Sequence, residues 1–142
     1  MQMVAKSPIV DVLITLQDAL GGQYGDLSRP QLRLMMKLGG TDPTVSELAQ
    51  RLNISSSGVT QMLDKLASRG YITRYSPEKD QRVVRVAISD RGREVLSIAV
   101  EQFEQRVLGM TQTFSGPDIE ALTELLRRMT QEFTRRKKRM PQ

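Results

Sequence analysis

The side chains best suited to chemistry gather between residues 55 and 85, and they are hydroxyls, amides and cations. The small polar groups belong to Ser55, Ser56, Ser57, Thr60 and Gln61. The six cations that follow, against only Glu78 and Asp80, are Lys65, Arg69, Arg74, Lys79, Arg82 and Arg85. Hydroxyls and amides can read base edges, and a local excess of positive charge attracts a polyanion. This segment therefore indicates a polyanionic partner, although a solvated basic face has a similar composition.

Several classes of protein are excluded by the residue types that are absent. The 142 residues include no Cys and no His, which removes disulfides, thiolate nucleophiles, Cys-ligated zinc and the commonest general base. The carboxylates of Glu78 and Asp80 lie in a basic stretch and form no evident catalytic pair. We therefore expect no enzyme, no bound metal and no cofactor.

Composition and hydropathy place the chain among globular proteins. It is 39% hydrophobic and 26% charged, close to globular averages, and its length fits one domain. No apolar run is long enough to span a membrane, and Lys6, Pro8 and Asp11 interrupt the amino-terminal segment where a signal peptide would be apolar. These features predict a cytoplasmic protein without a membrane partner.

Helix starts are marked by serine and threonine caps followed by apolar residues at helical spacing. Capping boxes are predicted at Ser28–Gln31 and Thr44–Glu47, and further N-caps at Ser55 and Ser115. The apolar spacing predicts six helices, which begin near residues 8, 28, 44, 55, 90 and 115. Asn53 and Gly70 stand where left-handed residues would end the third and fourth helices.

Between the fourth and fifth helices the apolar period changes from helical to alternating. Val84, Val86 and Ile88 alternate as in a half-buried strand, Tyr71–Tyr75 can supply its partner, and Ser76–Arg82 connects them. The predicted fold is mainly α with a small antiparallel β-hairpin. Two short helices, a tight turn and a hairpin follow in the order of a winged helix-turn-helix. In the fourth helix, the polar residues from Ser57 to Ser68 lie opposite the apolar stripe.

The segment from Thr44 to Leu96, which reads TVSELAQRLNISSSGVTQMLDKLASRGYITRYSPEKDQRVVRVAISDRGREVL, resembles the MarR family of bacterial transcription regulators. The matching positions are Gly70-Tyr71-Ile72, Arg74, Asp80-Gln81-Arg82, Ile88-Ser89 and Gly92. Two departures are Ser89 in place of the usual threonine and Gln81 in place of a frequent arginine. Asp64 is unusual on a face that meets phosphates, because it needs a cytosine amine or a basic partner there.

The resemblance implies one MarR-type domain over residues 1–142. It implies a winged helix-turn-helix over 28–90, with the helix-turn-helix at about 44–69 and the wing at about 71–89. Flanking helices in 1–25 and 91–138 would dimerise, and the apolar stripes near 7–21 and 91–138 also favour an interface because they are too wide for a small body to bury.

The function that the resemblance implies is sequence-specific binding of double-stranded DNA at a pseudo-palindromic operator by a homodimer. We expect a repressor that a small aromatic or phenolic effector releases. The expected DNA-binding residues are Ser55, Ser56, Ser57, Thr60, Gln61, Lys65, Arg74, Asp80 and Arg82. In the family the wing arginine, here Arg82, enters the minor groove, and the aspartate, here Asp80, holds it by an ion pair. The alternatives are a winged helix used only for protein contacts and, more remotely, an enzyme.

Two further features have a structural and a functional interpretation. Met35 and Met36 could line an effector crevice, although a role in the core is the favoured interpretation. The basic tail, 135–142, carries five consecutive cations from Arg135 to Arg139, as much as the net charge of +5 of the whole chain. Repulsion among them predicts a frayed helix end, which could add phosphate contacts to DNA or remain solvated.

Overall fold

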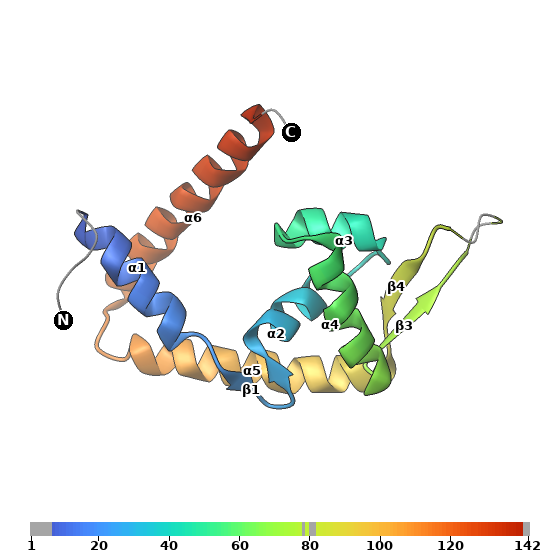
Figure 1. The fold of residues 1–142 in the computed structure, drawn as a ribbon. Coiled ribbons are helices and arrows are strands. Elements are labelled where there is room, and N and C mark those ends of the chain that lie inside the picture. The colour runs from blue at the N-terminus through green and yellow to red at the C-terminus, as the bar shows by residue number, and fades with distance from the viewer. Residues whose placement is uncertain (1–6, 78, 80–81, 141–142) are drawn as a thin grey trace. The chain divides into compact units, whose positions relative to one another are not determined.

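Six helices and two antiparallel hairpins follow one another in the computed structural model, which describes residues 7–77, 79 and 82–140. In chain order they are α1 (Pro8–Ala19), β1 (Gln23–Tyr24), β2 (Leu27–Ser28), α2 (Arg29–Met36), α3 (Val45–Leu52), α4 (Ser56–Ser68), β3 (Ile72–Tyr75), β4 (Arg85–Ile88), α5 (Asp90–Met110) and α6 (Gly116–Arg139) (Figure 1). The chain divides into two compact units, Met1–Gln105 and Arg106–Gln142, and the boundary falls inside α5. The predicted mainly helical fold with a small β-hairpin is confirmed.

Helix starts follow the predicted capping chemistry. The hydroxyl of Ser28 accepts a hydrogen bond from the backbone N–H of Gln31 at 3.3 Å, and the Gln31 side chain accepts from the Ser28 N–H at 2.9 Å. Thr44 and Glu47 form the same reciprocal pair at the start of α3. Such a cap contributes about 1 kcal/mol to helix stability, because it satisfies N–H groups that have no partner within the helix.

The core of the first unit consists of leucines and a few larger side chains from α2, α3, α4 and the hairpin β3–β4. Leu32, Leu48, Leu63 and Val86 are fully or almost fully buried, and no polar or charged residue is buried among the described residues. Ile54, in the turn between α3 and α4, is 38% exposed and is not part of this core. It directly precedes Ser55, the N-cap of α4.

A short hairpin, β1–β2, joins α1 to α2 and was not predicted. Gly25 turns it with φ of 57°, and its N–H donates to the Oε1 atom of Gln102 in α5 at 2.7 Å. The ring of Tyr24 is buried, and its centroid lies 5.2 Å from that of Phe103. The strands have two residues each, too few for an alternating pattern to be visible in the sequence.

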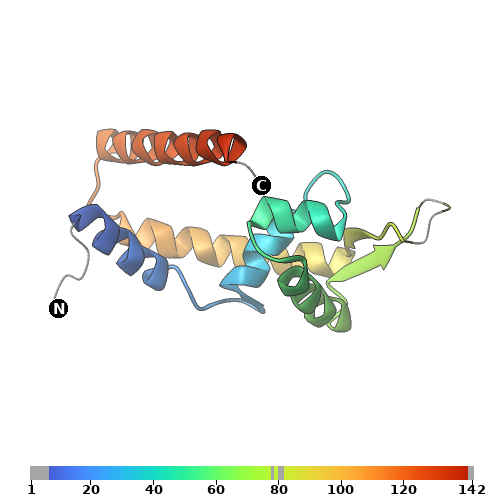
Figure 2. The same cartoon turned by 45° about the horizontal axis from the view of Figure 1, so that its top comes forward.

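The second hairpin, β3–β4, extends beyond α4 in both views (Figures 1 and 2). Its register pairs Ile72 with Ile88 and Arg74 with Val86. The strand begins at Arg85, two residues later than Val83, which directly follows the predicted connection Ser76–Arg82. The N–H of Val86 donates to the carbonyl of Pro43 at 2.9 Å, so the segment before α3 is tied to β4 as well.

The second unit contains the end of α5 and the long helix α6, which begins with a capping box of Ser115 and Asp118. The helix continues through Arg139, so the prediction of a frayed basic end was wrong. Glu132 accepts hydrogen bonds from Arg135 at 2.7 Å and from Arg136 at 2.9 Å, which offsets the repulsion among the cations. The same bonds lower the pKa of Glu132 to about 2. Cations at the carboxy end of a helix also interact favourably with its dipole.

Within the described ranges, no helix is long and apolar enough to cross a lipid bilayer.

Candidate nucleic-acid interface

The turn between α3 and α4 sets the direction of α4. Asn53 adopts the predicted left-handed conformation with φ of 56°, and Ser55 caps the next helix by accepting from the N–H of Gly58 at 3.0 Å. The Ser55 hydroxyl is therefore already used in capping. Of the predicted site residues on α4, it is the one whose side chain has a structural role at the helix start.

One face of α4 is fully polar and exposed. Val59, Leu63 and Leu66 are buried on the opposite side. The exposed residues of the predicted site on this helix are Ser56, Ser57, Thr60, Gln61 and Lys65. The hydroxyl of Thr60 donates to the carbonyl of Ser56 at 2.9 Å, which leaves its oxygen able to accept a hydrogen bond. Such a face, beginning at a helix amino terminus, has the donors, acceptors and size that the major groove of DNA admits.

Beside this face lies Arg74 on β3. Its guanidinium donates to the Oδ1 atom of Asp64 on α4 at 2.6 Å. The structure thus shows the basic partner that Asp64 requires, and the pair joins α4 to the hairpin.

Arg82 is exposed and lies next to the start of α3. It lines a shallow recess together with Val83, Val84 and the segment 44–46, which is the N-cap and the first two residues of α3. A helix amino terminus carries partial positive charge, so both sides of this recess favour an anion. Asp80, predicted to hold Arg82 by an ion pair, lies outside the described residues.

The loop-side end of the β3–β4 ladder, where Tyr75 pairs with Arg85, is held by contacts that sequence reasoning missed. The hydroxyl of Tyr75 donates to the carboxylate of Asp42, and Arg85 donates to the Asp42 carbonyl at 3.0 Å. The hydrogen bond to Asp42 raises the pKa of Tyr75. Thr44 also forms an isolated antiparallel bridge with Arg85. No spacing signal links Asp42 to Tyr75, since 33 positions separate them.

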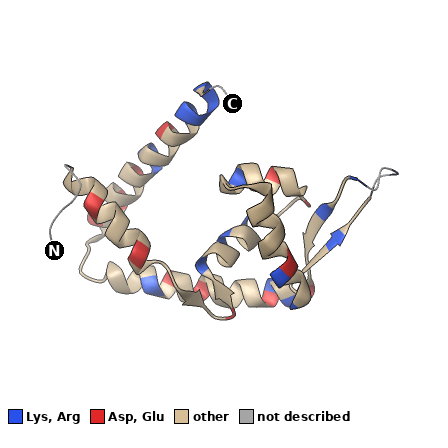
Figure 3. Ribbon diagram, in the orientation of Figure 1, with Lys and Arg blue, Asp and Glu red and all other residues tan. Residues whose placement is uncertain are grey.

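The six cations between residues 65 and 85 do not form one patch. Arg69 donates to the carbonyl of Asp26 at 2.7 Å and lies over the ring of Tyr71, so it supports the fold. Arg85 is half-buried and bonded to the Asp42 segment. The exposed cations of the hairpin are Arg74 on β3 and Lys79 and Arg82 in the connection between the strands. Figure 3 colours the basic positions on both strands blue.

The base of the hairpin, where Ile72 pairs with Ile88, joins α5 through Ser89. Its hydroxyl donates to the carbonyl of Gly70 at 2.5 Å and accepts from the N–H of Gly92 at 3.0 Å. Serine thus supplies the hydroxyl that the usual threonine of the resembled motif would provide. Gly92 is required by space: a Cβ atom there would lie 2.0 Å from the carbonyl oxygen of Tyr71.

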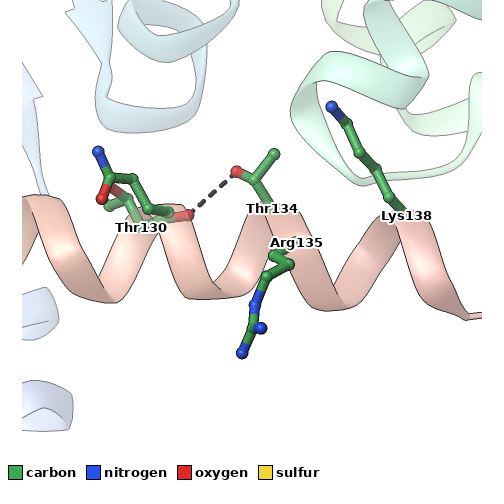
Figure 4. A pocket seen from close by; sticks show the side chains of 5 residues that line it. Thr130, Thr134, Arg135 and Lys138 are labelled. Atoms are coloured by element: carbon green, nitrogen blue, oxygen red, sulfur yellow. Dashed lines mark hydrogen bonds between the residues drawn. The ribbon is translucent and has the colours of Figure 1, made fainter.

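No second site with converging groups is seen in the part of the chain that the structure describes. A shallow hollow on α6 is lined by Thr130, Gln131, Thr134, Arg135 and Lys138 (Figure 4). All five come from one helix, and Arg135 points away from the side of Thr134 and Lys138, so they do not surround a ligand. Among the described residues there is also no cluster of three acidic side chains that could hold a metal ion.

Of the two candidate effector residues, Met35 is fully buried in the core and Met36 is 55% exposed. The core role is therefore confirmed for Met35 and wrong for Met36. Met36 is the last residue of α2, where the helix turns its final side chain outward from the core.

Comparisons with known proteins agree with this geometry. The sequence profile of the MarR family matches residues 27–84, which include α2, α3, α4 and β3. The uncharacterized HTH-type transcriptional regulator YdgJ of Bacillus subtilis is 30% identical over 104 residues, which cover 72% of this chain and 63% of YdgJ. YhbI of the same organism, also an HTH-type transcriptional regulator, is 29% identical over 74% of this chain and 69% of its own.

Solved structures show the same fold over nearly the whole chain. A crystal structure of MarR superposes with a TM-score of 0.85 at 18% identity and covers 99% of this chain and 100% of its own. A MarR protein from Peptoclostridium difficile superposes with a TM-score of 0.81 at 18% identity over 94% of this chain and 92% of its own. Both of these relatives are described as HTH-type transcriptional regulators. The chain thus has the winged helix-turn-helix fold of the MarR structures, and over residues 27–84 its sequence is similar to the MarR family.

Proposed function

We propose that this chain is a homodimeric regulator that binds double-stranded DNA in a sequence-specific manner at a pseudo-palindromic operator. The observation that carries the proposal is the exposed polar face of α4 with the cationic hairpin β3–β4 attached to it by the Asp64–Arg74 ion pair. In this arrangement α4 enters the major groove, and the hairpin, which we call the wing, follows the neighbouring backbone.

Individual roles follow from the position of each side chain. Gln61 and Thr60 lie on the exposed face of α4 and read base edges, and glutamine pairs well with adenine. Ser56 and Ser57, at the start of the helix, bind phosphate or base edges, while Ser55 fixes the helix start. Lys65 and Arg74 provide positive charge near the backbone. Arg82 enters the minor groove and is oriented by Asp80.

A homodimer is supported by apolar faces that the described residues leave uncovered. In α1 no residue is buried, and Ile9, Val12 and Ile14 are each more than half exposed. In α6 no residue is buried either, although an apolar stripe runs from Ile119 to Phe133. Faces of this kind normally lie in an interface. A two-fold dimer would present two α4 helices to a symmetric operator.

We further propose that the dimer acts in the cytoplasm as a repressor and that a small aromatic or phenolic effector releases it. Repression needs only a bound dimer that occludes the promoter, whereas activation needs a second contact surface. Met36, exposed at the end of α2, is a candidate for contact with such an effector, because its thioether adapts to flat apolar groups.

Selection of bound fragments from the source genome tests the proposal directly. We expect enrichment of a short inverted repeat, and a duplex carrying that repeat should bind much more tightly than a scrambled duplex of the same composition. Both duplexes are compared at the same salt concentration, because phosphate contacts make affinity strongly salt-dependent. If no duplex is retained even at 50 mM salt, the chain uses its winged helix for protein contacts instead.

A further inference from the structure

The acidic side chain on the exposed face of α4 has a specific partner and a specific place. Asp64 follows Gln61 by three positions and Thr60 by four, so all three lie on one face of the helix. Its side chain is 61% exposed, and its Oδ1 atom is 2.6 Å from the Arg74 guanidinium. A free carboxylate at this place would repel DNA phosphates, but one that holds a cation is neutralised.

Arg74 reaches Asp64 because of the hairpin register. Arg74 is directly opposite Val86, which is fully buried, so the two side chains lie on the same face of the hairpin. The stem of Arg74 is therefore directed toward the body of the unit, and its side chain is only 32% exposed. In the unbound protein the guanidinium is held against α4 and turned away from the solvent-facing side of the wing.

A pair as exposed as this one contributes little to stability, since solvent screens it. Its effect on DNA binding is larger, because it decides whether Arg74 is available to a phosphate. We infer that Asp64 is a specificity-determining residue that holds Arg74 until a cytosine replaces it. This inference rests on the proposed DNA binding.

Cytosine is the base whose major-groove edge fits the exchange. Its N4 amino group is a hydrogen-bond donor, and a carboxylate is a suitable acceptor for it. The guanine and thymine edges present acceptors that a carboxylate repels, and the adenine edge has the N7 acceptor directly beside its amino group, which disfavours a carboxylate there as well. When a cytosine faces Asp64, its N4 amino group replaces the Arg74 guanidinium as the hydrogen-bond donor to the carboxylate. Arg74 is then released to a neighbouring phosphate. With other bases, Arg74 stays paired and one phosphate contact per protomer is missing.

The exchange predicts opposite effects of one substitution on random and on specific DNA. In Asp64→Asn the side chain keeps its size and loses its charge, so Arg74 is released on any sequence. Each extra phosphate contact steepens the slope of log affinity against log salt by about 0.9, and each protomer gains one such contact. Between 1 M and 0.15 M salt this slope corresponds to roughly a fivefold gain in affinity per protomer. Affinity for the selected operator should not rise, so the ratio of specific to random binding falls.

The experiment compares four proteins on a random-sequence duplex of 30 base pairs and on the duplex selected by the wild type, from 0.1 to 0.5 M salt. The proteins are the wild type, Asp64→Asn, the double variant Asp64→Asn with Arg74→Gln, and Glu124→Gln. Glu124 is a matched control, because it pairs with Arg127 at the same distance of 2.6 Å and is similarly exposed, at 57%. Thermal denaturation of each protein verifies the fold.

We expect Asp64→Asn alone to bind random duplex more tightly with a steeper slope, and repeated selection with it to lose a cytosine in each half-site. A slope equal to those of Glu124→Gln and the wild type would overturn the inference while leaving DNA binding intact. A steeper slope that persists without Arg74 would overturn it too, since Asp64 would then act by repelling phosphates. A wild type that binds neither duplex would overturn both the proposed function and this inference. If Asp64→Asn does not fold, Asp64→Ser takes its place: it also removes the charge, so it should bind random duplex with a steeper slope than the wild type, and an unchanged slope overturns the inference.

Discussion

Replacing Gly92 by alanine should detach the wing from α5. The added Cβ atom would lie 2.0 Å from the carbonyl oxygen of Tyr71 and 2.9 Å from the Cγ1 atom of Ile88. The carbonyl cannot simply move away, because it accepts the N–H of Ser89 at 3.1 Å and thereby joins the start of β3 to the end of β4. Relief of the clash therefore requires a backbone shift at the junction between the wing and α5.

The magnitude can be bounded from two opposing effects. Alanine favours a helix over glycine by about 0.5–1 kcal/mol. Overpacking at a rigid site costs about 1–3 kcal/mol and more where backbone must move. Because the contact at Gly92 is with backbone and is far inside van der Waals distance, we expect a net loss of about 2 kcal/mol. For a domain of this size that corresponds to a fall in Tm of roughly 5–10 °C.

The same helix offers a matched control. Gly109 also lies in α5, and a Cβ atom there would meet nothing within 4 Å. Gly109→Ala should therefore raise stability slightly through helix propensity alone. Urea and thermal unfolding of both variants are compared with the wild type at one protein concentration, because a dimer is stabilised by mass action. A Gly92→Ala protein as stable as Gly109→Ala would refute the close approach of α5 to Tyr71.

Four further outcomes are expected. Arg82→Ala should strongly weaken binding to the selected operator. Gln61→Ala should remove about 1–3 kcal/mol of discrimination between bases at one operator position and so change which base is preferred there. Selection of bound fragments with each variant measures both effects, and equal small effects on specific and random duplexes would contradict the assignment. Sedimentation at micromolar concentration should give the mass of a dimer, since α1 and α6 bury none of their residues, and a monomeric mass would exclude the proposed interface. Deletion of 135–142 should lower the affinity for random duplex and flatten the slope of log affinity against log salt by about 0.9 per lost phosphate contact, while the base preference is unchanged. An unchanged slope would mean that the basic end of α6 does not touch DNA. The hydrogen bond to Asp42 raises the pKa of Tyr75 in the folded protein above its unfolded value of 10.0. The stabilisation of the fold by this bond is therefore complete below pH 10.0 and is lost as the pH rises through the higher folded pKa. Unfolding titrations at alkaline pH should show this loss of stability in the wild type and not in Tyr75→Phe.

The sequence by itself determined the features that depend on neighbouring residues. A capping box needs only positions three apart, so Ser28–Gln31 and Thr44–Glu47 could be identified without a fold. The left-handed turns at Asn53 and Gly70 were predicted for the same reason, because each backbone conformation is preferred by its own residue type. The apolar period separated helices from the β3–β4 hairpin, and the family resemblance assigned their order to a winged helix-turn-helix.

The tertiary structure alone decided which polar groups meet across the chain. The partner of Asp64 is ten positions away on another element, and that of Tyr75 is 33 positions away, so neither leaves a periodic signal. The same holds for the cations between residues 65 and 85, of which Arg69 and Arg85 are used by the fold, although their charge alone made them equivalent to the others. The basic end of α6 was mispredicted because repulsion was counted without the bonds from Arg135 and Arg136 to Glu132. Features that depend on the spacing of neighbouring residues can be identified in the sequence directly, but a contact between distant residues depends on where packing brings their elements together.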